Sequence, residues 1–250
     1  MLKIRNEQIN VFQQAAVRDF EDQLVKYVGE HFPKHYGNLG ETGVRKVVRY
    51  GLNRAESHRL IDKRSISLYV SFMFMLGSHF DTDPQLPWAL EILKDEITPD
   101  EKLRIDRLYD KVMEYFDHVA GDNEYIDKAL RRIRKEQIES LSSSGSGGLL
   151  DDMTLFLNKI FPQKCEYIGE DLIRSMILHG IKAAKRYNIT DERGLIIYIS
   201  LMFILGSSFD TDPQFPWVMA ILNDETTTDE TEKILRLYTE AATRLDKWLA

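Results

Sequence analysis

The fold is decided by a segment that occurs twice: GSHFDTDPQLPW at residues 77–88 and GSSFDTDPQFPW at residues 206–217. The displacement of 129 positions holds without a gap from Phe32 to about Val119, and roughly 40% of the aligned residues are identical. Self-similarity at one fixed displacement is the mark of a duplicated structural unit. The sequence therefore predicts two homologous halves that share one fold.

A serine- and glycine-rich run, SSSGSGG at residues 142–148, lies between the two copies. This composition is typical of flexible linkers, whether natural or engineered to join two related chains. We expect a first helical repeat at 1–121, a connecting helix and linker at 122–148, and a second helical repeat at 149–250. The basic residues at 128–135 of the connecting helix suit either a solvated face or a docking patch for an acidic partner.

Apolar residues recur at intervals of three and four in both copies, and no stretch alternates long enough to predict a strand. The chain is therefore predicted to be all-α, with about five helices per repeat. Gly51 and Gly180 interrupt apolar helix stripes, which predicts close helix packing because glycine otherwise costs about 1 kcal/mol relative to alanine. Asp62 and Thr190 are predicted N-caps, and the Thr98 and Thr227 segments read as capping boxes.

Composition excludes several classes of function. The 250 residues are 43% hydrophobic, and their net charge of -7 argues against a nucleic-acid partner. The apolar runs at 66–76 and 195–205 are too short for a bilayer, which needs about 20 residues, and the N-terminus lacks a secretory apolar region. We therefore expect a cytoplasmic protein without a membrane partner. The single cysteine, Cys165, excludes an internal disulfide.

The duplicated loop is the best candidate for a functional site, because it is the longest conserved block between the copies and connects two helices. A structural interpretation has the aspartates accepting backbone N–H groups, with Arg45 and Arg174 or Arg64 and Arg193 as counter-ions. A metal interpretation has too few oxygen ligands, and His79 is replaced by Ser208. A third interpretation is a binding surface for a protein partner. The candidate residues are Asp81, Asp83, Trp88, Asp210, Asp212 and Trp217.

Catalytic and cofactor motifs are missing from the sequence. There is no Gly-rich phosphate loop, no His-Glu-x-x-His pair, no Gly-x-Ser-x-Gly elbow and no Cys-x-x-Cys pair. None of the six histidines aligns with another histidine across the repeat. We therefore expect no catalytic residue, no metal and no cofactor, and predict that the protein is not an enzyme.

The first copy resembles a family of small helical bacterial proteins encoded beside type VI secretion spike, tip and toxin genes. The likeness lies in LKIR at residues 2–5 and Glu7-Gln8, in Phe32-Pro33, and above all in the FDTDPQLPW block at residues 80–88. It covers residues 1 to about 135. The second copy shares the block but lacks the N-terminal signature. The resemblance implies a secretion-system accessory that binds protein. This implication rests on fold and gene neighbourhood, which do not by themselves establish an activity.

These observations predict a non-enzymatic protein-interaction module of a bacterial secretion and toxin system. Its partner is expected to be a toxin or effector, bound as immunity protein or adaptor-chaperone, or a secretion spike component. An acidic surface would favour association with a basic toxin. Two rival hypotheses are an effector or enzyme with an Asp-based metal site at the duplicated loops, and a structural component of the secretion apparatus.

Overall fold

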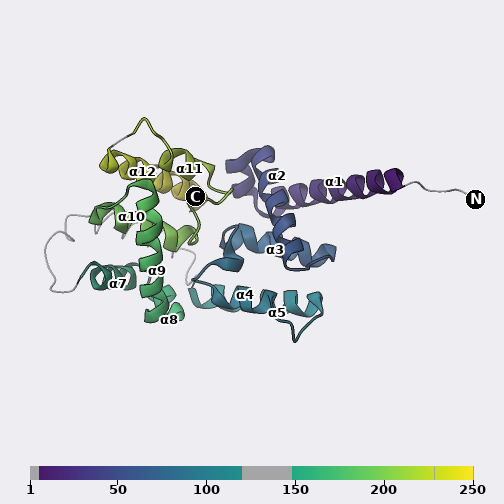
Figure 1. Ribbon diagram of the computed structural model, residues 1–250, viewed down its shortest axis with the longest axis horizontal. Helices are drawn as coiled ribbons and strands as arrows, with labels where there is room; N and C mark the ends of the chain where they lie inside the picture. The colour runs from purple at the N-terminus through teal and green to yellow at the C-terminus, as the bar shows by residue number, and fades with distance from the viewer. Residues whose placement is uncertain (1–5, 120–147, 228, 250) are drawn as a thin grey trace, which may run out of the picture.

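The computed structural model describes residues 6–119, 148–227 and 229–249. These residues form eleven α-helices and two short 3₁₀ helices, with no strand among them (Figure 1). The predicted all-α fold class is confirmed for this part of the chain. The connecting helix predicted at 122–141, and the linker apart from Gly148, lie outside the described residues.

The helices fall into two groups that lie side by side in Figure 1. The first half, residues 6–119, contains α1 (Asn6–His31), α2 (Pro33–Ser57), α3 (Lys63–Leu76), the 3₁₀ helix η1 (Phe80–Thr82), α4 (Pro87–Leu93) and α5 (Glu101–Val119). The second half, residues 148–249, contains α7 (Leu149–Ile160), α8 (Pro162–Ile168), α9 (Glu170–Ala184), η2 (Lys185–Tyr187), α10 (Glu192–Leu205), α11 (Pro216–Leu222) and α12 (Glu230–Leu249). The bounds of α10 and α11 are those of α3 and α4 moved by 129 residues.

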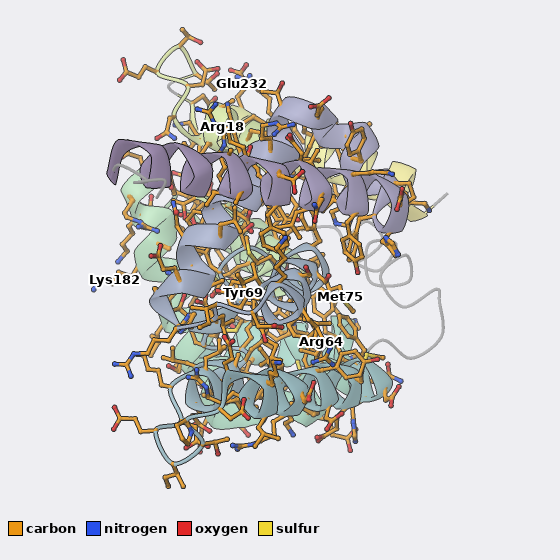
Figure 2. The ribbon with its side chains drawn as sticks, turned by 90° about the vertical axis from the view of Figure 1, so that its right-hand side faces the viewer. Arg18, Arg64, Tyr69, Met75, Lys182 and Glu232 are labelled. Carbon is orange, nitrogen blue, oxygen red and sulfur yellow. The ribbon has the colours of Figure 1, made fainter. Side chains whose placement is uncertain are left out.

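Each half has its own hydrophobic core. In the first half, Tyr69 of α3 is fully buried between α1 and α5, which lie on opposite sides of it in Figure 2. In the second half, α10 is apolar nearly all round and is buried along most of its length, as expected of a central helix. Tyr167 of α8 packs against both cores, and its ring lies 5.4 Å from that of Tyr115 in α5.

The glycines at the centres of α2 and α9 allow the close packing predicted for them. A Cβ atom on Gly51 would lie 2.8 Å from the Met73 sulfur, and one on Gly180 would lie 2.7 Å from Ile199 Cγ1. Both distances are shorter than a van der Waals contact. The central helix of each core therefore approaches its neighbour at a point where only glycine fits.

Helix starts follow the predictions only in part. Asp62 caps α3 as expected, accepting from Arg64 N, but α10 is capped by Asp191 and not by Thr190. The cap of α5 is Asp100, which accepts from Lys102 N, so Thr98 is not the N-cap. The Glu101 carboxylate instead accepts from Ile61 N and Asp62 N, and Glu230 accepts likewise from Thr190 N and Asp191 N. Each glutamate thereby ties the last long helix to the start of the central helix.

Among the described residues, no helix is both long enough and apolar enough to cross a membrane. The two apolar runs noted in the sequence are α3 and α10, which are 14 residues long and form the centres of the two cores.

Candidate functional site

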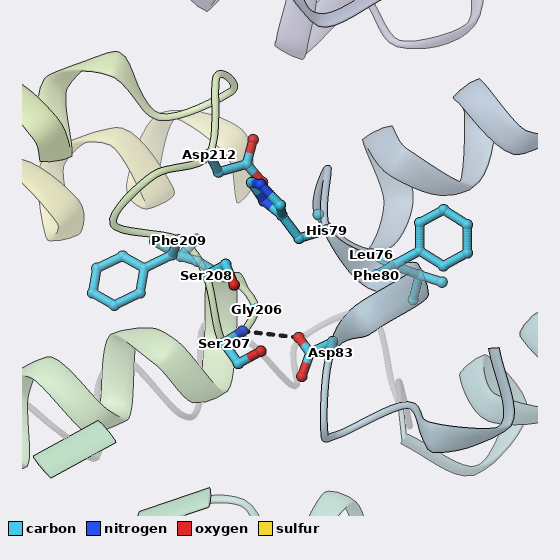
Figure 3. A pocket seen from close by; sticks show the side chains of 11 residues that line it. Leu76, His79, Phe80, Asp83, Gly206, Ser207, Ser208, Phe209 and Asp212 are labelled. Atoms are coloured by element: carbon cyan, nitrogen blue, oxygen red, sulfur yellow. Dashed lines mark hydrogen bonds between the residues drawn. The ribbon is translucent and has the colours of Figure 1, made fainter. Parts of the chain in front are cut away.

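The two duplicated loops face each other across the boundary between the halves (Figure 3). Each loop begins at a glycine that ends the central helix, Gly77 with φ +101° and Gly206 with φ +100°. A Cβ atom on Gly77 would lie 3.1 Å from the Leu205 carbonyl oxygen, and one on Gly206 would lie 3.3 Å from Asp83 Oδ2. Glycine therefore meets two demands here, a backbone conformation that L-residues avoid and a close approach to the opposite half.

The second aspartate of each loop crosses the boundary. Ser207 N donates to Asp83 Oδ2 at 2.8 Å, and Ser78 N donates to Asp212 Oδ2 at 2.7 Å. The other oxygen of each carboxylate accepts from a backbone N–H of its own loop, that of Gln85 or Gln214. Both aspartates are buried. Each carboxylate therefore closes its own turn and binds the first turn of the opposite loop.

The glutamines two residues further on make a second pair of crossed contacts. Gln85 Nε2 donates to the Met202 carbonyl at 3.0 Å, and Gln214 Nε2 donates to the Met73 carbonyl at 2.7 Å. Both carbonyls lie in the last turns of α3 and α10 and also accept from the glycine N–H that ends each helix, Gly77 N or Gly206 N, so each glutamine uses the second lone pair of its carbonyl. We call Asp83, Gln85, Asp212 and Gln214, with the backbone groups that they contact across the boundary, the clasp.

The first aspartate of each loop stays within its own half. Asp81 is completely buried and accepts from Arg54 Nη2 at 2.5 Å, His58 Nε2 at 2.6 Å and Tyr69 OH at 2.8 Å. Burial acts to raise the pKa of this carboxyl, but the hydrogen bonds from His58, Arg54 and Tyr69 outweigh burial and hold the pKa below its ordinary value. Asp81 is therefore a charged, fully bonded anchor of η1.

Asp210 is held in a similar way by different residues. Arg186 Nη2 and Tyr187 OH each donate to Asp210 Oδ2 at 2.9 Å. Arg186 aligns with Ser57 and not with Arg54, so the arginine has moved by three positions, close to one helical turn, between the copies. The ion pair is kept while its position in the sequence is not.

The counter-ions predicted from the sequence are wrong. Arg45 binds Glu21, Asp22 and Glu41 on the surface formed by α1 and α2, and Arg64 binds Asp106. Arg174 binds Asp151 and Glu170, and Arg193 is exposed. Both copies have these arginines at matching positions, whereas the true partners, Arg54 and Arg186, occupy positions that do not align.

The two tryptophans fix the short helices α4 and α11 against the last helix of each half. Trp88 is partly buried, with its ring 6.2 Å from that of Tyr115, and Trp217 is partly buried beneath the guanidinium of Arg244 at 5.5 Å. Tyr115 and Arg244 align across the repeat. The structure therefore brings Asp83 and Asp212 together at the boundary, but places Trp88 and Trp217 apart from them, at the packing of α4 on α5 and of α11 on α12.

The crevice between the loops is too tight for a ligand. It is lined by residues of both loops, among them His79, Asp83 and Asp212, and it leaves no room for a water-sized molecule. Within the described parts of the chain, no three His, Cys, Asp or Glu side chains gather as metal ligands would. The oxygens of the clasp carboxylates already accept protein N–H groups. This arrangement is chemically suited to holding two protein surfaces together.

A buried lysine lies close to the clasp. Lys164 of α8 donates to the Phe203 carbonyl, and burial lowers the pKa of its amine to about 8, although the Asp83 charge opposes that shift. Cys165 beside it is also buried, which raises the pKa of the thiol to about 12. A thiol with this pKa is almost entirely protonated near pH 7, so Cys165 acts as a small apolar residue of the core and not as a nucleophile.

Comparison of the chain with known protein families, with curated proteins and with solved structures gives no match.

The crossed contacts are what sequence reasoning missed. A repeated Asp-Thr-Asp-Pro-Gln segment showed that the two loops are equivalent, but it did not show that they meet. One signal in the sequence did indicate buried polar contacts. Each loop follows an apolar helix and a glycine, and its polar side chains are too short to reach far into solvent. Such groups need partners when buried.

Proposed function

We propose that this protein is a non-enzymatic protein-interaction module built from two copies of one helical unit, which the clasp holds as a fixed pair. The observation that carries the proposal is that the clasp carboxylates, those of Asp83 and Asp212, are buried and accept hydrogen bonds from protein N–H groups. These carboxylates are already hydrogen-bonded within the protein, and the crevice around them leaves no room for a water-sized molecule, so a metal ion or a substrate does not reach them. The loop is thereby assigned a structural role, and the outer surfaces of the paired halves are left for a partner.

The proposed setting is a bacterial secretion and toxin system, in which the chain binds a toxin or effector as immunity protein or adaptor-chaperone. The resemblance of the FDTDPQLPW block supports this setting, and the net charge of -7 supports a partner with a basic surface. A rigid pair of halves also suits binding, because a preorganised surface loses less conformational entropy when a partner binds.

Co-expression with the toxin encoded beside the gene tests the proposal. We expect the tagged full chain to retain the toxin through purification. Survival of cells that express both proteins would assign immunity, and binding without protection would assign the adaptor role. Failure to bind either the toxin or a spike component would overturn the proposal.

The same preparation tests the metal-dependent alternative. Isothermal titration of the full chain with Mg²⁺ is expected to give no saturable heat, and Asp83→Asn and Asp212→Asn are expected to lower stability without abolishing any turnover. Toxicity of the chain on expression, or Mg²⁺-dependent turnover that both substitutions remove, would replace the binding role with an enzymatic one.

A further inference from the structure

A cleft of about 870 Å³ opens on the first half, and Thr82 of the duplicated loop lines it, whereas none of the four clasp side chains does. The C-terminal end of α2, the end of α4, the loop after it and the first turn of α5 form its walls. Four cationic side chains line it, Arg54, Arg59, Lys94 and Arg104, against the two carboxylates of Asp95 and Glu96. The cleft is therefore a basic site on a chain whose overall charge is acidic.

Two of these cations are already used by the protein. Arg54 is bound to Asp81, and Arg104 is buried and donates to the Leu93 and His58 carbonyls. The other two, Arg59 and Lys94, are exposed and make no ion pair with any residue that the structure describes. Of the carboxylates, Asp95 is paired with Arg107. The cleft thus retains positive charge that the protein itself does not neutralise.

Arg59 is held in a backbone conformation that disfavours it. Its φ is +57°, and Leu60 N donates to the Ala55 carbonyl to close the end of α2. The aligned residue of the second half, Asn188, has φ +60°, and asparagine tolerates this region far better than arginine does. The first half therefore keeps a cation at a position where the fold alone would favour asparagine or glycine.

The second half lacks the two unpaired cations, although Arg104 aligns with Lys233 and Arg186 replaces Arg54 as the partner of the loop aspartate. Lys94 aligns with Asn223, Arg59 with Asn188 and Arg54 with Ala183. A neighbouring structural pair is nevertheless preserved, because Arg236 binds Asp224 just as Arg107 binds Asp95. The copies have diverged in the charge of the cleft while keeping the ion pair beside it.

Three exposed apolar side chains lie close in sequence to residues that line the cleft and have polar counterparts in the second half. Ile61, Ile97 and Leu103 are 82%, 94% and 56% exposed, and each lies within two residues of a residue that lines the cleft. Their counterparts in the second half are Thr190, Thr226 and Glu232. Singly exposed apolar residues are ordinary on protein surfaces, so it is the replacement of all three by polar residues in the second half that points to a role for them.

We infer that this cleft binds an acidic peptide segment of a protein partner, with carboxylates at Arg59 and Lys94 and apolar side chains against Ile61, Ile97 and Leu103. The inference rests on the proposed function as a protein-interaction module, and it names the part of the partner that is recognised. A lone phosphate would fill little of 870 Å³ and would make no use of the apolar side chains Leu90 and Leu93 that line the cleft. This acidic segment is separate from the basic surface of the partner that the net charge of -7 would attract, and the unpaired cations of the cleft favour it locally.

The second half supplies the test substitutions. Arg59→Asn with Lys94→Asn places the residues of the second half in the cleft, and Arg59→Asn is expected to raise the melting temperature because asparagine suits φ +57°. Lost binding would therefore not report lost folding. Lys46→Asn with Lys182→Asn removes the same charge from exposed positions outside the cleft and serves as the matched control.

The probe is a displayed random dodecapeptide library, selected on the full chain, after which the most enriched peptide is labelled and titrated by fluorescence anisotropy. We expect enriched peptides to combine Asp or Glu with Leu, Ile or Phe. The cleft variant is expected to weaken binding about tenfold, equivalent to about 1.4 kcal/mol, and the control variant to bind within about twofold of the unchanged chain.

Enrichment of basic or uncharged peptides, or equal affinity of the cleft variant, would overturn the inference. Displacement of the peptide by millimolar inorganic phosphate as readily as by unlabelled peptide would also overturn it, in favour of a small-anion site. If the co-expressed toxin binds the cleft variant as well as the unchanged chain, the cleft inference fails while the proposed function stands. If the unchanged chain binds no partner at all, the proposed function fails.

Discussion

Substitution of Asp83 by asparagine tests the clasp with the smallest change of shape. The carboxylate accepts two backbone N–H groups, Gln85 N at 2.8 Å and Ser207 N at 2.8 Å, one on each oxygen. Asparagine retains one acceptor oxygen and presents an NH₂ group to the other N–H. A buried hydrogen bond to a charged group contributes about 1.5 to 3 kcal/mol, and an unpaired buried N–H costs about 1 to 3 kcal/mol. We expect Asp83→Asn to lower the free energy of unfolding by about 3 kcal/mol.

Asp212→Asn is expected to cost less, about 1 to 2 kcal/mol. Burial raises the pKa of the Asp212 carboxyl, so its charged form is penalised and a neutral amide recovers part of that penalty. Asp83 also provides negative charge near Lys164, whose buried amine loses that support in Asp83→Asn. The predicted order of stability is thus Asp212→Asn above Asp83→Asn.

Urea unfolding followed by far-ultraviolet circular dichroism measures both effects. Because each half has its own core, loss of the clasp is expected to separate one cooperative transition into two. The double variant is expected to lose about 1 kcal/mol less than the two single losses together, since the two sites share one boundary. If both single variants unfold within about 0.5 kcal/mol of the unchanged chain, as the exposed control Asp110→Asn should, the clasp does not join the halves.

Three further predictions concern single residues. Lys164 has a folded pKa of about 8 against 10.5 when unfolded, so the folded state binds fewer protons and the free energy of unfolding should rise by about 3 kcal/mol between about pH 8 and 10.5. Lys164→Met should be more stable at pH 7 and should lack this rise in its urea midpoint. An equal rise in both chains would refute the assignment. The lowered pKa of Asp81 stabilises the fold above about pH 4, and that contribution is lost as the pH falls through the folded pKa. Asp81→Ala should therefore lower the melting temperature at pH 7 and make the melting temperature fall less steeply in acid. An unchanged melting temperature with lost partner binding would make Asp81 a binding residue. Gly206→Ala should destabilise by about 1 to 3 kcal/mol because φ is +100° and the new methyl group meets Asp83. Gly37→Ala, inside α2 with open space around the new methyl group, should cause no loss of stability in the same unfolding assay, and an equal loss in both variants would contradict the role of Gly206.

The helices could be predicted from the sequence because their signals are local. Apolar spacing places α3 and α10, the Asp62 cap follows from its own neighbours, and the glycine in the α2 stripe predicts close packing. The cap of α5 was missed because Thr98 and Asp100 both suit an N-cap, and only the three-dimensional course of the loop selects Asp100.

The site could not be predicted to the same degree, because its contacts join residues far apart in the chain. Ser78 N and Asp212 are 134 positions apart, and no local pattern reports such a pairing. The arginine partner of the first aspartate shifts by three positions between the copies, so alignment of the repeats pointed to the wrong residues. Both halves keep an arginine–aspartate ion pair at this place in the fold, although the arginine stands at a different position in each sequence.

Cleavage between the halves tests the central claim most directly. A protease site is placed within residues 142–147, the full chain is cut after folding, and the dissociation constant of the two fragments is measured by analytical ultracentrifugation. The clasp predicts that the fragments of the unchanged chain sediment as one complex, and that Asp83→Ala with Asp212→Ala weakens their association about hundredfold, which corresponds to about 2.8 kcal/mol. Fragments that separate without any substitution, or that associate equally tightly with both aspartates removed, would contradict it.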